Sequence, residues 1–485
     1  MSTDVSFRSI AKISGWLLLF EGVLLCVPCL TGVIYRESDW SAFAVAAVAA
    51  IAAGLSLCIP LRHVKTRLRR REGYLLTSLV WVLFSLFGMI PFMISSQPLD
   101  VASAFFETMS GFTTTGASVI ADVEAQSHAV LLWRALTQWI GGLGIVLFLL
   151  ALLPALNQAG GISVYNAETT GITHDKLHPR IRQTAASLWK IYLVLTSAMI
   201  LLLWASPMNF FDSLCQSMSA MSTGGFSTRN AGIAAWNSDY VTVVITVFMF
   251  VAGVNFVLLY SVWRGDRRSL WRNDVFRTYL GVVAVTYLFF LLSLLLHHQG
   301  SNISDLLLKP LFHIVSALTS TGFGIADYAK WGPLCVGLTI LLMIFGACAG
   351  STTGGLKIDR IVVLYKNIKR QTHMSLFPNH LVAIEVGGRQ VESRNLASVT
   401  ALLAMYLIAL SAGTLLMTAQ GRDLVDAFFA TVSCVGNNGL GYGITGAGFG
   451  DLSAVTKWAM SGLMLIGRLE FFTVITLFTA SFWRR

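Results

Sequence analysis

The chain has 485 residues, of which 55% are hydrophobic and only 12% are charged, and its formal net charge at pH 7 is +10. Soluble domains carry about 25% charged residues. This composition therefore excludes an ordinary soluble protein, a disordered chain and a nucleic-acid-binding domain, and no nucleic-acid partner is expected despite the positive charge.

Ten stretches are apolar enough to be membrane spans, each of which needs about 20 residues. In chain order they are 10–31, 41–61, 74–96, 130–154, 185–205, 239–262, 278–297, 332–348, 396–418 and 455–482. Shorter apolar segments lie between some of these spans, at 99–113, 209–222, 305–319 and 424–436. They are too short to cross a bilayer, so we predict that they enter the membrane and return on the same side.

The basic residues indicate which side of the membrane each loop faces. Most of the 34 lysines and arginines lie before the first span, after every second span, or at the C-terminus. Loops on the cytoplasmic side are rich in lysine and arginine. We therefore predict a multi-pass protein with both termini in the cytoplasm, and we read the net charge as a topology signal that says little about substrate.

Four segments of the chain align without gaps, and each lies at the end of one of the short apolar segments. Each has a serine six residues before a glycine, which is followed by an apolar residue and a small residue. The aligned glycines are Gly116, Gly225, Gly322 and Gly439. The pattern predicts two leading helices and then four units, each made of a span, a short pore helix, a glycine loop and a second span.

Four such loops can converge on one axis and form a cation filter. Non-helical backbone is tolerated at membrane depth where it is buried or lines water, and a ring of carbonyls can replace the hydration shell of an ion. The negative C-terminal ends of the short helices also favour a cation. The alternative is that these are small-residue packing motifs at helix interfaces. The candidate filter residues are Thr114, Thr115, Gly116, Thr223, Gly224, Gly225, Ser320, Thr321, Gly322, Asn437, Asn438 and Gly439.

Several further motifs accompany the four loops. They are Trp139-Ile-Gly-Gly-Leu-Gly144, Ala167-Glu-Thr169, Lys176-Leu-His-Pro-Arg180, Gly224-Gly-Phe-Ser-Thr228, Arg272-Asn-Asp-Val-Phe-Arg277, Gly350-Ser-Thr-Thr-Gly-Gly355 and Gly467-Arg-Leu-Glu470. Together these features resemble the TrkH/TrkG branch of the Trk–Ktr–HKT superfamily of potassium transporters over nearly the whole chain. The two leading helices favour the TrkH type over the Ktr type.

The resemblance implies an all-α polytopic membrane protein with a pseudo-fourfold pore in each subunit. It implies a homodimer in the bacterial inner membrane, in contact with lipid, with K⁺ as the transported ion and no organic cofactor in this chain. It also implies regulation by a TrkA-like cytosolic subunit that binds NAD and ATP. Serine in place of the first filter glycine is associated with sodium preference in this superfamily, so Gly116 favours potassium. The fourth loop, with Asn437 and Asn438, is the most divergent.

This organisation predicts five consecutive parts of the chain. They are two leading helices with a basic loop (1–72) and pore repeats at 73–183, 184–276, 277–395 and 396–485. The basic loop after the second span can bind anionic lipid. The cytosolic segments 155–184 and 357–395 are candidate docking sites for a regulatory ring.

The second span of the third repeat is interrupted at 346–355, where four glycines and three hydroxyl side chains lie within ten residues. A continuous helix there is weak, because each glycine costs about 1 kcal/mol relative to alanine. The resemblance implies an intramembrane loop below the filter that gates the pore; the alternative is a helix end with a flexible cytoplasmic turn. The candidate gate residues are Gly346, Ala349, Gly350, Ser351, Thr352, Thr353, Gly354, Gly355 and Arg468.

Arg468 lies inside the last apolar span. A guanidinium there is costly and usually faces a cavity or a partner. The resemblance places an arginine below the filter near the gating loop, where it would act as an electrostatic barrier to cations. The alternative is a structural ion pair with a carboxylate. Glu470 is two residues away and would point elsewhere on a helix.

Glu107, Gln216, His313 and Ala430 share one repeat position, nine residues before the filter glycine. We predict that the polar members brace the filter by hydrogen bonding, and a proton-coupling role for Glu107 or His313 is the alternative.

Two other function classes are alternatives to a potassium pore. A secondary transporter of another cation or solute commonly has inverted repeats, whereas these units all start on the same side. An enzyme is not expected, because no Gly-x-Ser-x-Gly, His-Glu-x-x-His, Walker or dinucleotide motif lies in a suitable context.

Overall fold

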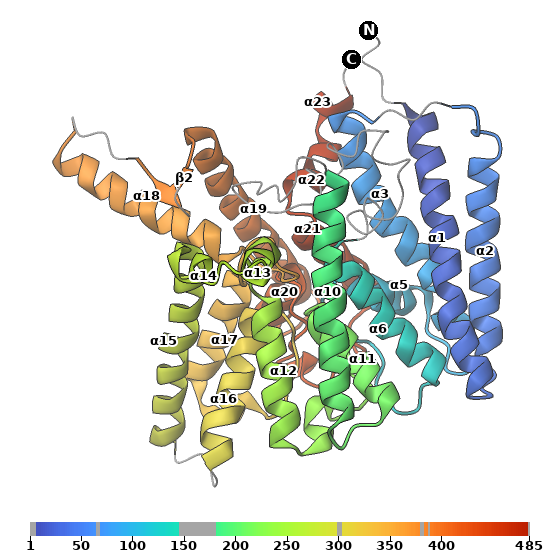
Figure 1. The fold of residues 1–485 in the computed structure, drawn as a ribbon, viewed down its shortest axis with the longest axis horizontal. Helices are drawn as coiled ribbons and strands as arrows, with labels where there is room; N and C mark the ends of the chain where they lie inside the picture. The colour runs from blue at the N-terminus through green and yellow to red at the C-terminus, as the bar shows by residue number, and fades with distance from the viewer. Residues whose placement is uncertain are drawn as a thin grey trace.

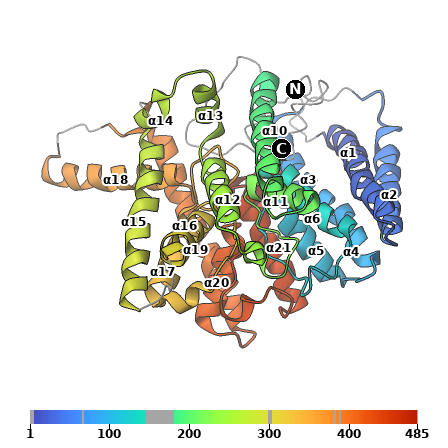
Figure 2. The ribbon, with the colours of Figure 1, turned by 60° about the horizontal axis from the view of Figure 1, so that its bottom comes forward.

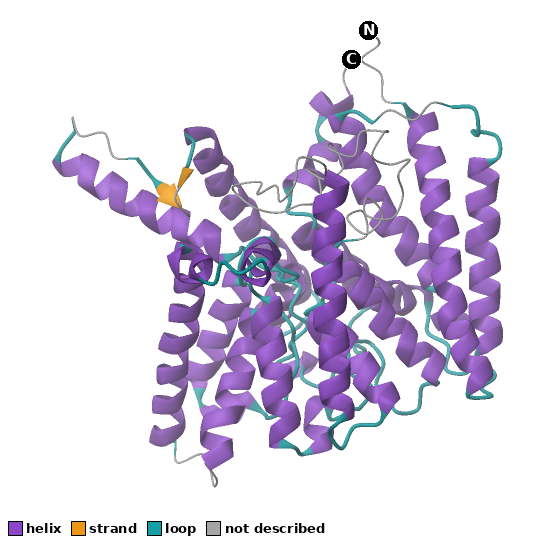
Figure 3. Cartoon of the chain, viewed as in Figure 1, coloured by secondary structure: helices purple, strands orange, loops and turns teal. Residues whose placement is uncertain are grey.

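The computed structural model describes residues 6–64, 68–144, 181–297, 303–378, 383–386 and 389–483. The regular structure in these ranges is almost entirely helical (Figure 3). Two short strands, β1 (Glu385–Val386) and β2 (Arg389–Gln390), form an antiparallel ladder in which Glu385 is opposite Gln390. The fold is thus the all-α arrangement that the sequence predicts.

The two leading helices are α1 (Phe7–Ile34) and α2 (Trp40–Cys58), which pack along each other at one side of the bundle (Figure 1). Glycines permit this close approach, because a Cβ added to Gly54 would lie 2.8 Å from the carbonyl oxygen of Gly15. Helix α1 also contacts the first repeat, so the two leading helices lie beside this repeat, at one side of the described bundle.

Each repeat begins with a long helix, continues with a short pore helix and ends with a second helix. The first helices are α3 (Arg70–Gly88, extended by α4, Ile90–Ile94), α10 (Ile181–Trp204), α15 (Asp274–Leu296) and α19 (Ser393–Thr418). The pore helices are α5 (Val101–Phe112), α11 (Phe210–Met221), α16 (Ile303–Leu318) and α20 (Leu424–Val435). The second helices are α6 (His128–Gly142), α12 (Asp239–Ala252), α17 (Pro333–Phe345) and α21 (Ala454–Arg468).

The remaining helices are peripheral to this fourfold plan. They are α13 (Phe256–Trp263), α14 (Arg268–Arg272), α18 (Ile358–Leu376), α22 (Phe472–Ile475) and α23 (Ala480–Trp483). Short 3₁₀ helices lie at Gly232–Trp236, Tyr328–Trp331, Gly443–Thr445 and Thr476–Phe478. Helix α18 projects from the bundle, and the start of α1 and the end of α23 lie at one end of the molecule (Figure 1).

The four repeats close into a ring. The second helix of each repeat contacts the pore helix of the next repeat: α6 packs on α11, α12 on α16, α17 on α20, and α21 on α5. The view in Figure 2 brings the lower ends of these helices forward, around the centre of the bundle. This arrangement directs the C-terminal ends of the pore helices toward one region.

Six described helices are long and apolar enough to cross a membrane, and two further pairs pass the same test only as bent spans. The prediction of continuous spans at 239–262 and 455–482 is wrong, because α12 and α13 meet at 102° and α21 and its continuation at 110°. Averaging hydropathy over a window cannot detect such breaks, since the residues at the breaks are themselves largely apolar. In the third repeat, α17 ends at Phe345, and the second half of window 130–154 lies largely outside the described residues.

Candidate functional site

The four aligned loops have the same backbone conformation. The residue two positions before each glycine has a positive φ, and the values are 55° for Thr114, 54° for Thr223, 52° for Ser320 and 51° for Asn437. The aligned glycines follow at 80°, 83°, 78° and 75°. A non-glycine residue in this region is uncommon and is held there by its surroundings. The fourfold repeat seen in the sequence is therefore also a repeat in geometry.

The loops interlock around a closed ring through their glycines. A Cβ added to Gly116 would lie 2.0 Å from the carbonyl oxygen of Gly224 in the next loop, closer than any real contact. The equivalent pairs are Gly225 with Thr321 (2.0 Å), Gly322 with Asn438 (2.0 Å) and Gly439 with Thr115 (2.2 Å). Each glycine thus leaves room for a backbone carbonyl of the next loop. The contact between Gly439 and Thr115 joins the fourth loop to the first and closes the ring.

Each loop also folds back onto its own pore helix. In the first repeat the backbone N–H of Thr115 donates to the carbonyl of Ser110 at 2.9 Å. The equivalent bonds run from Gly224 to Ser219, Thr321 to Ser316 and Asn438 to Ser433, at 2.8 to 2.9 Å. The aligned serine therefore marks the point at which helix backbone closes the loop, which explains its constant spacing from the glycine.

The two asparagines of the fourth loop are tied to neighbouring repeats by their amides. Asn437 Nδ2 donates to Thr115 Oγ1 and to the Met464 carbonyl, both at 2.9 Å, and Asn438 Nδ2 donates to the Ala317 carbonyl at 2.7 Å. The amide oxygens of Asn437 and Asn438 are buried without a hydrogen-bond partner in the described structure. The side chains of Asn437 and Asn438 therefore connect the fourth repeat to the first and third repeats.

All four glycines line one half-open cavity of about 780 Å³. Its wall also includes Arg134, Asn230 and Asp426. At its rim the amide of Asn230 donates to Asp122 at 2.8 Å, and this hydrogen bond lowers the pKa of that exposed carboxyl. The ring of loops is therefore open to this cavity.

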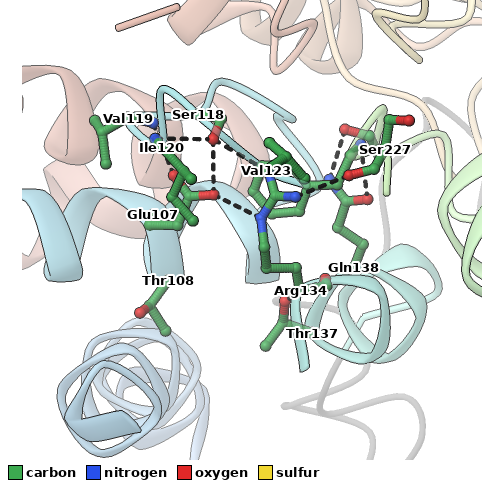
Figure 4. A network of polar contacts seen from close by, with 12 residues as sticks. Glu107, Thr108, Ser118, Val119, Ile120, Val123, Arg134, Thr137, Gln138 and Ser227 are labelled. Carbon is green, nitrogen blue, oxygen red and sulfur yellow. Dashed lines mark hydrogen bonds and ion pairs between the residues drawn. The ribbon is translucent and has the colours of Figure 1, made fainter. Parts of the chain in front are cut away.

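A buried ion pair braces the first loop (Figure 4). Glu107 on α5 accepts from Arg134 Nε on α6 at 2.9 Å, and their side chains are 0% and 3% exposed. The same carboxylate accepts from Ser118 Oγ at 3.0 Å and from the Val119 N–H at 2.8 Å. Arg134 also donates to the Ser227 carbonyl at 2.9 Å in the second loop. The bracing role of Glu107 agrees with the prediction from its repeat position, whereas no sequence motif marks Arg134 as its partner.

The second and third repeats use neutral groups at the same position. Gln216 Nε2 donates to Ser227 Oγ at 2.9 Å, beyond the second filter glycine. The His313 ring contacts Thr339 Oγ1 at 2.9 Å. A second glutamine, Gln138 on α6, donates to the Gly224 carbonyl at 2.6 Å. Gln216 and Gln138 thus each join a helix to the second loop, as predicted for Gln216. The contact of His313 instead joins the pore helix α16 to α17.

Replacing Glu107 by glutamine should destabilise the protein and reduce potassium-over-sodium discrimination. The change leaves the Arg134 guanidinium buried without its carboxylate, which costs about 3–5 kcal/mol when one partner of a buried pair is removed. Thermal unfolding in detergent and rubidium uptake with sodium as competitor measure the two effects. The double variant Glu107→Gln with Arg134→Gln should recover part of the lost stability; a double variant worse than the single one would contradict this account.

The candidate gate residues between α17 and α18 form a buried loop against the filter. Gly354 N–H donates to Ser320 Oγ at 2.7 Å, and Thr352 Oγ1 lies 3.3 Å from Thr223 Oγ1. A Cβ on Gly354 would lie 2.2 Å from the carbonyl oxygen of Gly436. The loop thus touches three of the four filter loops, and Thr352 is fully buried.

The break in the second repeat holds the other side of this loop. Phe256 N–H donates to the Gly350 carbonyl at 2.9 Å, and Asn255 Nδ2 donates to the Ala349 carbonyl at 2.8 Å. Ser351 Oγ and Thr353 Oγ1 contact each other at 2.7 Å, and a Cβ on Gly346 would meet the Gly354 carbonyl. Gly355, at a φ of 76°, completes the packing against Gly346.

Arg468, at the end of α21, joins the loop to the first repeat. Its guanidinium donates to the carbonyls of Thr352 (2.7 Å), Gly141 (2.7 Å) and Gly142 (2.6 Å). All three of these hydrogen bonds are made with backbone carbonyls. Arg468 therefore lies against the loop 346–355, in agreement with the position that the resemblance implies.

Glu470 does not continue a helix. Glu470 and Phe471 have φ values of 56° and 43°, a backbone that costs of order 1–3 kcal/mol per residue and that ends α21. Its carboxylate pairs with Arg360 and lies 3.6 Å from Lys357 Nζ. The sequence prediction that it points away from Arg468 says nothing of these partners, which only the folded chain brings together.

The motifs 167–169 and 176–180 and the segment 155–184, apart from its last four residues, lie outside the described residues.

Comparison with known proteins identifies relatives over the full chain. The family model TrkH, described as a cation transport protein, matches residues 40–485. The Trk system potassium uptake protein TrkH of Escherichia coli K12 is 37% identical over 485 residues, with 99% of each chain covered. The TrkG protein of the same organism is 33% identical, covering 98% of this chain and 99% of its own.

The fold has a solved counterpart as well. The crystal structure of the potassium transporter TrkH from Vibrio parahaemolyticus superposes with a TM-score of 0.89 at 31% identity, covering 99% of this chain and 100% of that one. Family model, full-length identity and fold agree, and the chain belongs to the TrkH family of cation transport proteins.

Proposed function

We propose that this chain takes up potassium ions across the bacterial inner membrane through its ring of four loops. Its relatives are named as potassium uptake proteins. The observation that carries the proposal is the closed interlock of four equivalent loops at the floor of one cavity. A ring of backbone oxygens replaces the water around an ion without any covalent step, so the function is transport and not catalysis.

The filter in this proposal consists of three residues per loop, namely 114–116, 223–225, 320–322 and 437–439. Potassium is the cargo, and no organic cofactor takes part. The C-terminal ends of the four pore helices face this region and favour a cation there. The fourfold division into 73–183, 184–276, 277–395 and 396–485, after leading helices in 1–72, follows from the same repeat.

The loop 346–355 with Arg468 is the gate. It lies against three filter loops and is buried, so an ion leaving the filter must displace it. Both termini face the cytoplasm, the working unit is a homodimer in contact with membrane lipid, and a TrkA-like cytosolic subunit that binds NAD and ATP regulates the gate. These assignments rest on the resemblance to the Trk system and on the distribution of basic residues.

Deleting residues inside 347–353 should raise basal cation flux. The deletion removes the Thr352 contacts below the filter while leaving the four interlocking glycines in place. Rubidium uptake into proteoliposomes measures the effect, with circular dichroism and gel filtration as folding controls. Unchanged flux in well-folded protein would contradict the gate.

Potassium uptake itself is tested by radioactive rubidium uptake into proteoliposomes of the purified chain, with potassium, sodium and lithium as competitors. Potassium should block uptake far better than sodium. Absence of cation flux, with and without a cytosolic partner, would remove the filter and favour a secondary transporter of another solute. Uptake that requires a proton or sodium gradient would keep the filter but make the transport coupled.

A further inference from the structure

We propose that Glu470, Lys357 and Arg360 form an ionic latch that keeps the intramembrane loop closed and that movement of α18 releases. The latch deepens the gate proposed above and rests on it. It makes Glu470 a positioning residue, which acts on the ion path through the loop and not by touching the ion.

The loop is attached to the rest of the protein on two sides, at the filter and at α18. On the filter side Gly354 and Thr352 contact the second, third and fourth filter loops. On the other side the chain passes directly into α18, where Ile358 N–H donates to the Ala347 carbonyl at 2.9 Å and Leu356 N–H to the Ile344 carbonyl at 3.0 Å. The start of α18 therefore cannot move without pulling on the loop.

Ion pairs join three charged side chains at this junction, and a fourth, the buried Asp359, lies beside them in the first turn of α18. The Glu470 carboxylate pairs with Arg360 Nη2 and lies 3.6 Å from Lys357 Nζ. The exposed fractions of the Lys357, Arg360 and Glu470 side chains are 6%, 7% and 21%. Charges this buried are screened little by salt, and removing one member takes an opposite charge away from a buried group, which is costly. Removing one partner from this junction should therefore cost more than removing one partner of an exposed ion pair.

Both basic residues belong to the moving side. Lys357 immediately precedes α18 and has a φ of 70°, and Arg360 lies in the first turn of that helix. Arg360 also donates to the Leu356 carbonyl at 3.0 Å, the last turn of the loop. The guanidinium therefore connects the loop, the helix and the carboxylate at one point.

The acidic residue belongs to the fixed side. Glu470 follows Arg468 by two residues, at the break that ends α21. Arg468 holds the middle of the loop through the Thr352 carbonyl, and Glu470 holds its end through Lys357 and Arg360. One short stretch of the fourth repeat thus grips the loop of the third repeat at two places. The positive φ at Glu470 is what turns its side chain away from the helical path of Arg468.

Helix α18 provides the lever. It runs for 19 residues from the latch and projects away from the bundle (Figure 1). A second tie, between Lys366 Nζ and Asp274 at 3.0 Å, joins it to α15, but these side chains are 33% and 32% exposed. A displacement of the outer part of α18 can break this weaker tie first and then act on the latch. The expected order of events is movement of α18, loss of the Glu470 pairs and withdrawal of the loop from the filter.

The test measures basal rubidium flux of full-length protein in proteoliposomes. Glu470→Gln should raise the flux roughly tenfold while leaving the potassium-over-sodium ratio unchanged, since the filter contacts remain. Arg360→Gln should do the same, and the double variant should add little, because both changes break one latch. The control is Asp305→Asn, which removes a more exposed pair with Lys309 on α16 and should leave flux unchanged.

Further variants separate the latch from general damage. In protein that already lacks part of 347–353, Glu470→Gln should have no added effect. Where Glu470→Gln does not insert, Glu470→Asp keeps the charge and shortens the reach, and it should raise the flux by a smaller factor. Additive single effects, or a changed ion ratio, would overturn the latch.

The outcomes also distinguish this proposal from the gate itself. If loop deletion raises flux while Glu470→Gln and Arg360→Gln do not, the gate stands and the latch is wrong. If loop deletion leaves flux unchanged, the gate is wrong and the latch falls with it.

Discussion

Gly116→Ala should abolish most potassium uptake and the discrimination against sodium. The added Cβ would lie 2.0 Å from the Gly224 carbonyl oxygen, so the second loop must move. The φ of 80° adds a backbone cost of about 1–2 kcal/mol for a residue with a Cβ. We expect rubidium uptake to fall by roughly tenfold or more, equivalent to at least about 1.4 kcal/mol, and sodium to compete more effectively.

The matched control is Gly281→Ala on α15. A Cβ at Gly281 meets nothing within 4 Å, and this glycine lies in a helix, where alanine is favoured. Its uptake should equal that of the unchanged protein. Because the loops are equivalent, alanine at Gly225, Gly322 or Gly439 should resemble Gly116→Ala. A Gly116→Ala protein that keeps full uptake and selectivity would contradict the interlocking ring.

Arg468→Ala should raise cation leak. The guanidinium donates to three carbonyls that belong to the proposed gate, the loop 346–355, and to α6, and hydrogen bonds to a charged group contribute about 1.5–3 kcal/mol. Its loss frees the middle of the loop and also removes a positive charge from below the filter. We expect basal rubidium flux to rise roughly tenfold. Unchanged flux in inserted protein would contradict both roles.

Arg468→Lys separates the charge from the contacts. Lysine keeps the positive charge but lacks the planar fork that reaches several acceptors. A rise in basal rubidium flux like that of Arg468→Ala would show that the hydrogen bonds are needed. An unchanged basal flux would show that the positive charge is sufficient. In both cases the potassium-over-sodium ratio should stay unchanged, because the filter is intact.

The pore helices were predictable because two independent signals agree on them. Hydropathy limits their length, and the aligned serine and glycine fix their ends, so segments such as 99–113 and 424–436 match α5 (Val101–Phe112) and α20 (Leu424–Val435) closely. The breaks after α12 and α21 were not predictable in this way. Each break holds a single polar or charged residue among apolar neighbours, Asn255 or Glu470, and the ion-pair partners of Glu470 come from another repeat.

The chemistry of the site divides in the same manner. Glycine positions follow from the sequence, because only a residue without Cβ fits the interlock. Side-chain roles do not, as Asn438 shows: its amide reaches the Ala317 carbonyl across repeats. Arg134 was likewise not identified, since the number of basic residues in a loop does not reveal which one is buried beside Glu107.

The closed ring of loops has a consequence for how selectivity can change over generations. All four loops are encoded separately in one chain, so a single mutation alters only one of the four loops. Its first effect is on the one neighbouring loop whose carbonyl packs against the mutated position. In an assembly of four identical subunits the same mutation would change every quarter at once. The selectivity of a ring encoded in one chain can therefore change one loop at a time. The two asparagines of the fourth loop are a difference of this kind from the other three loops.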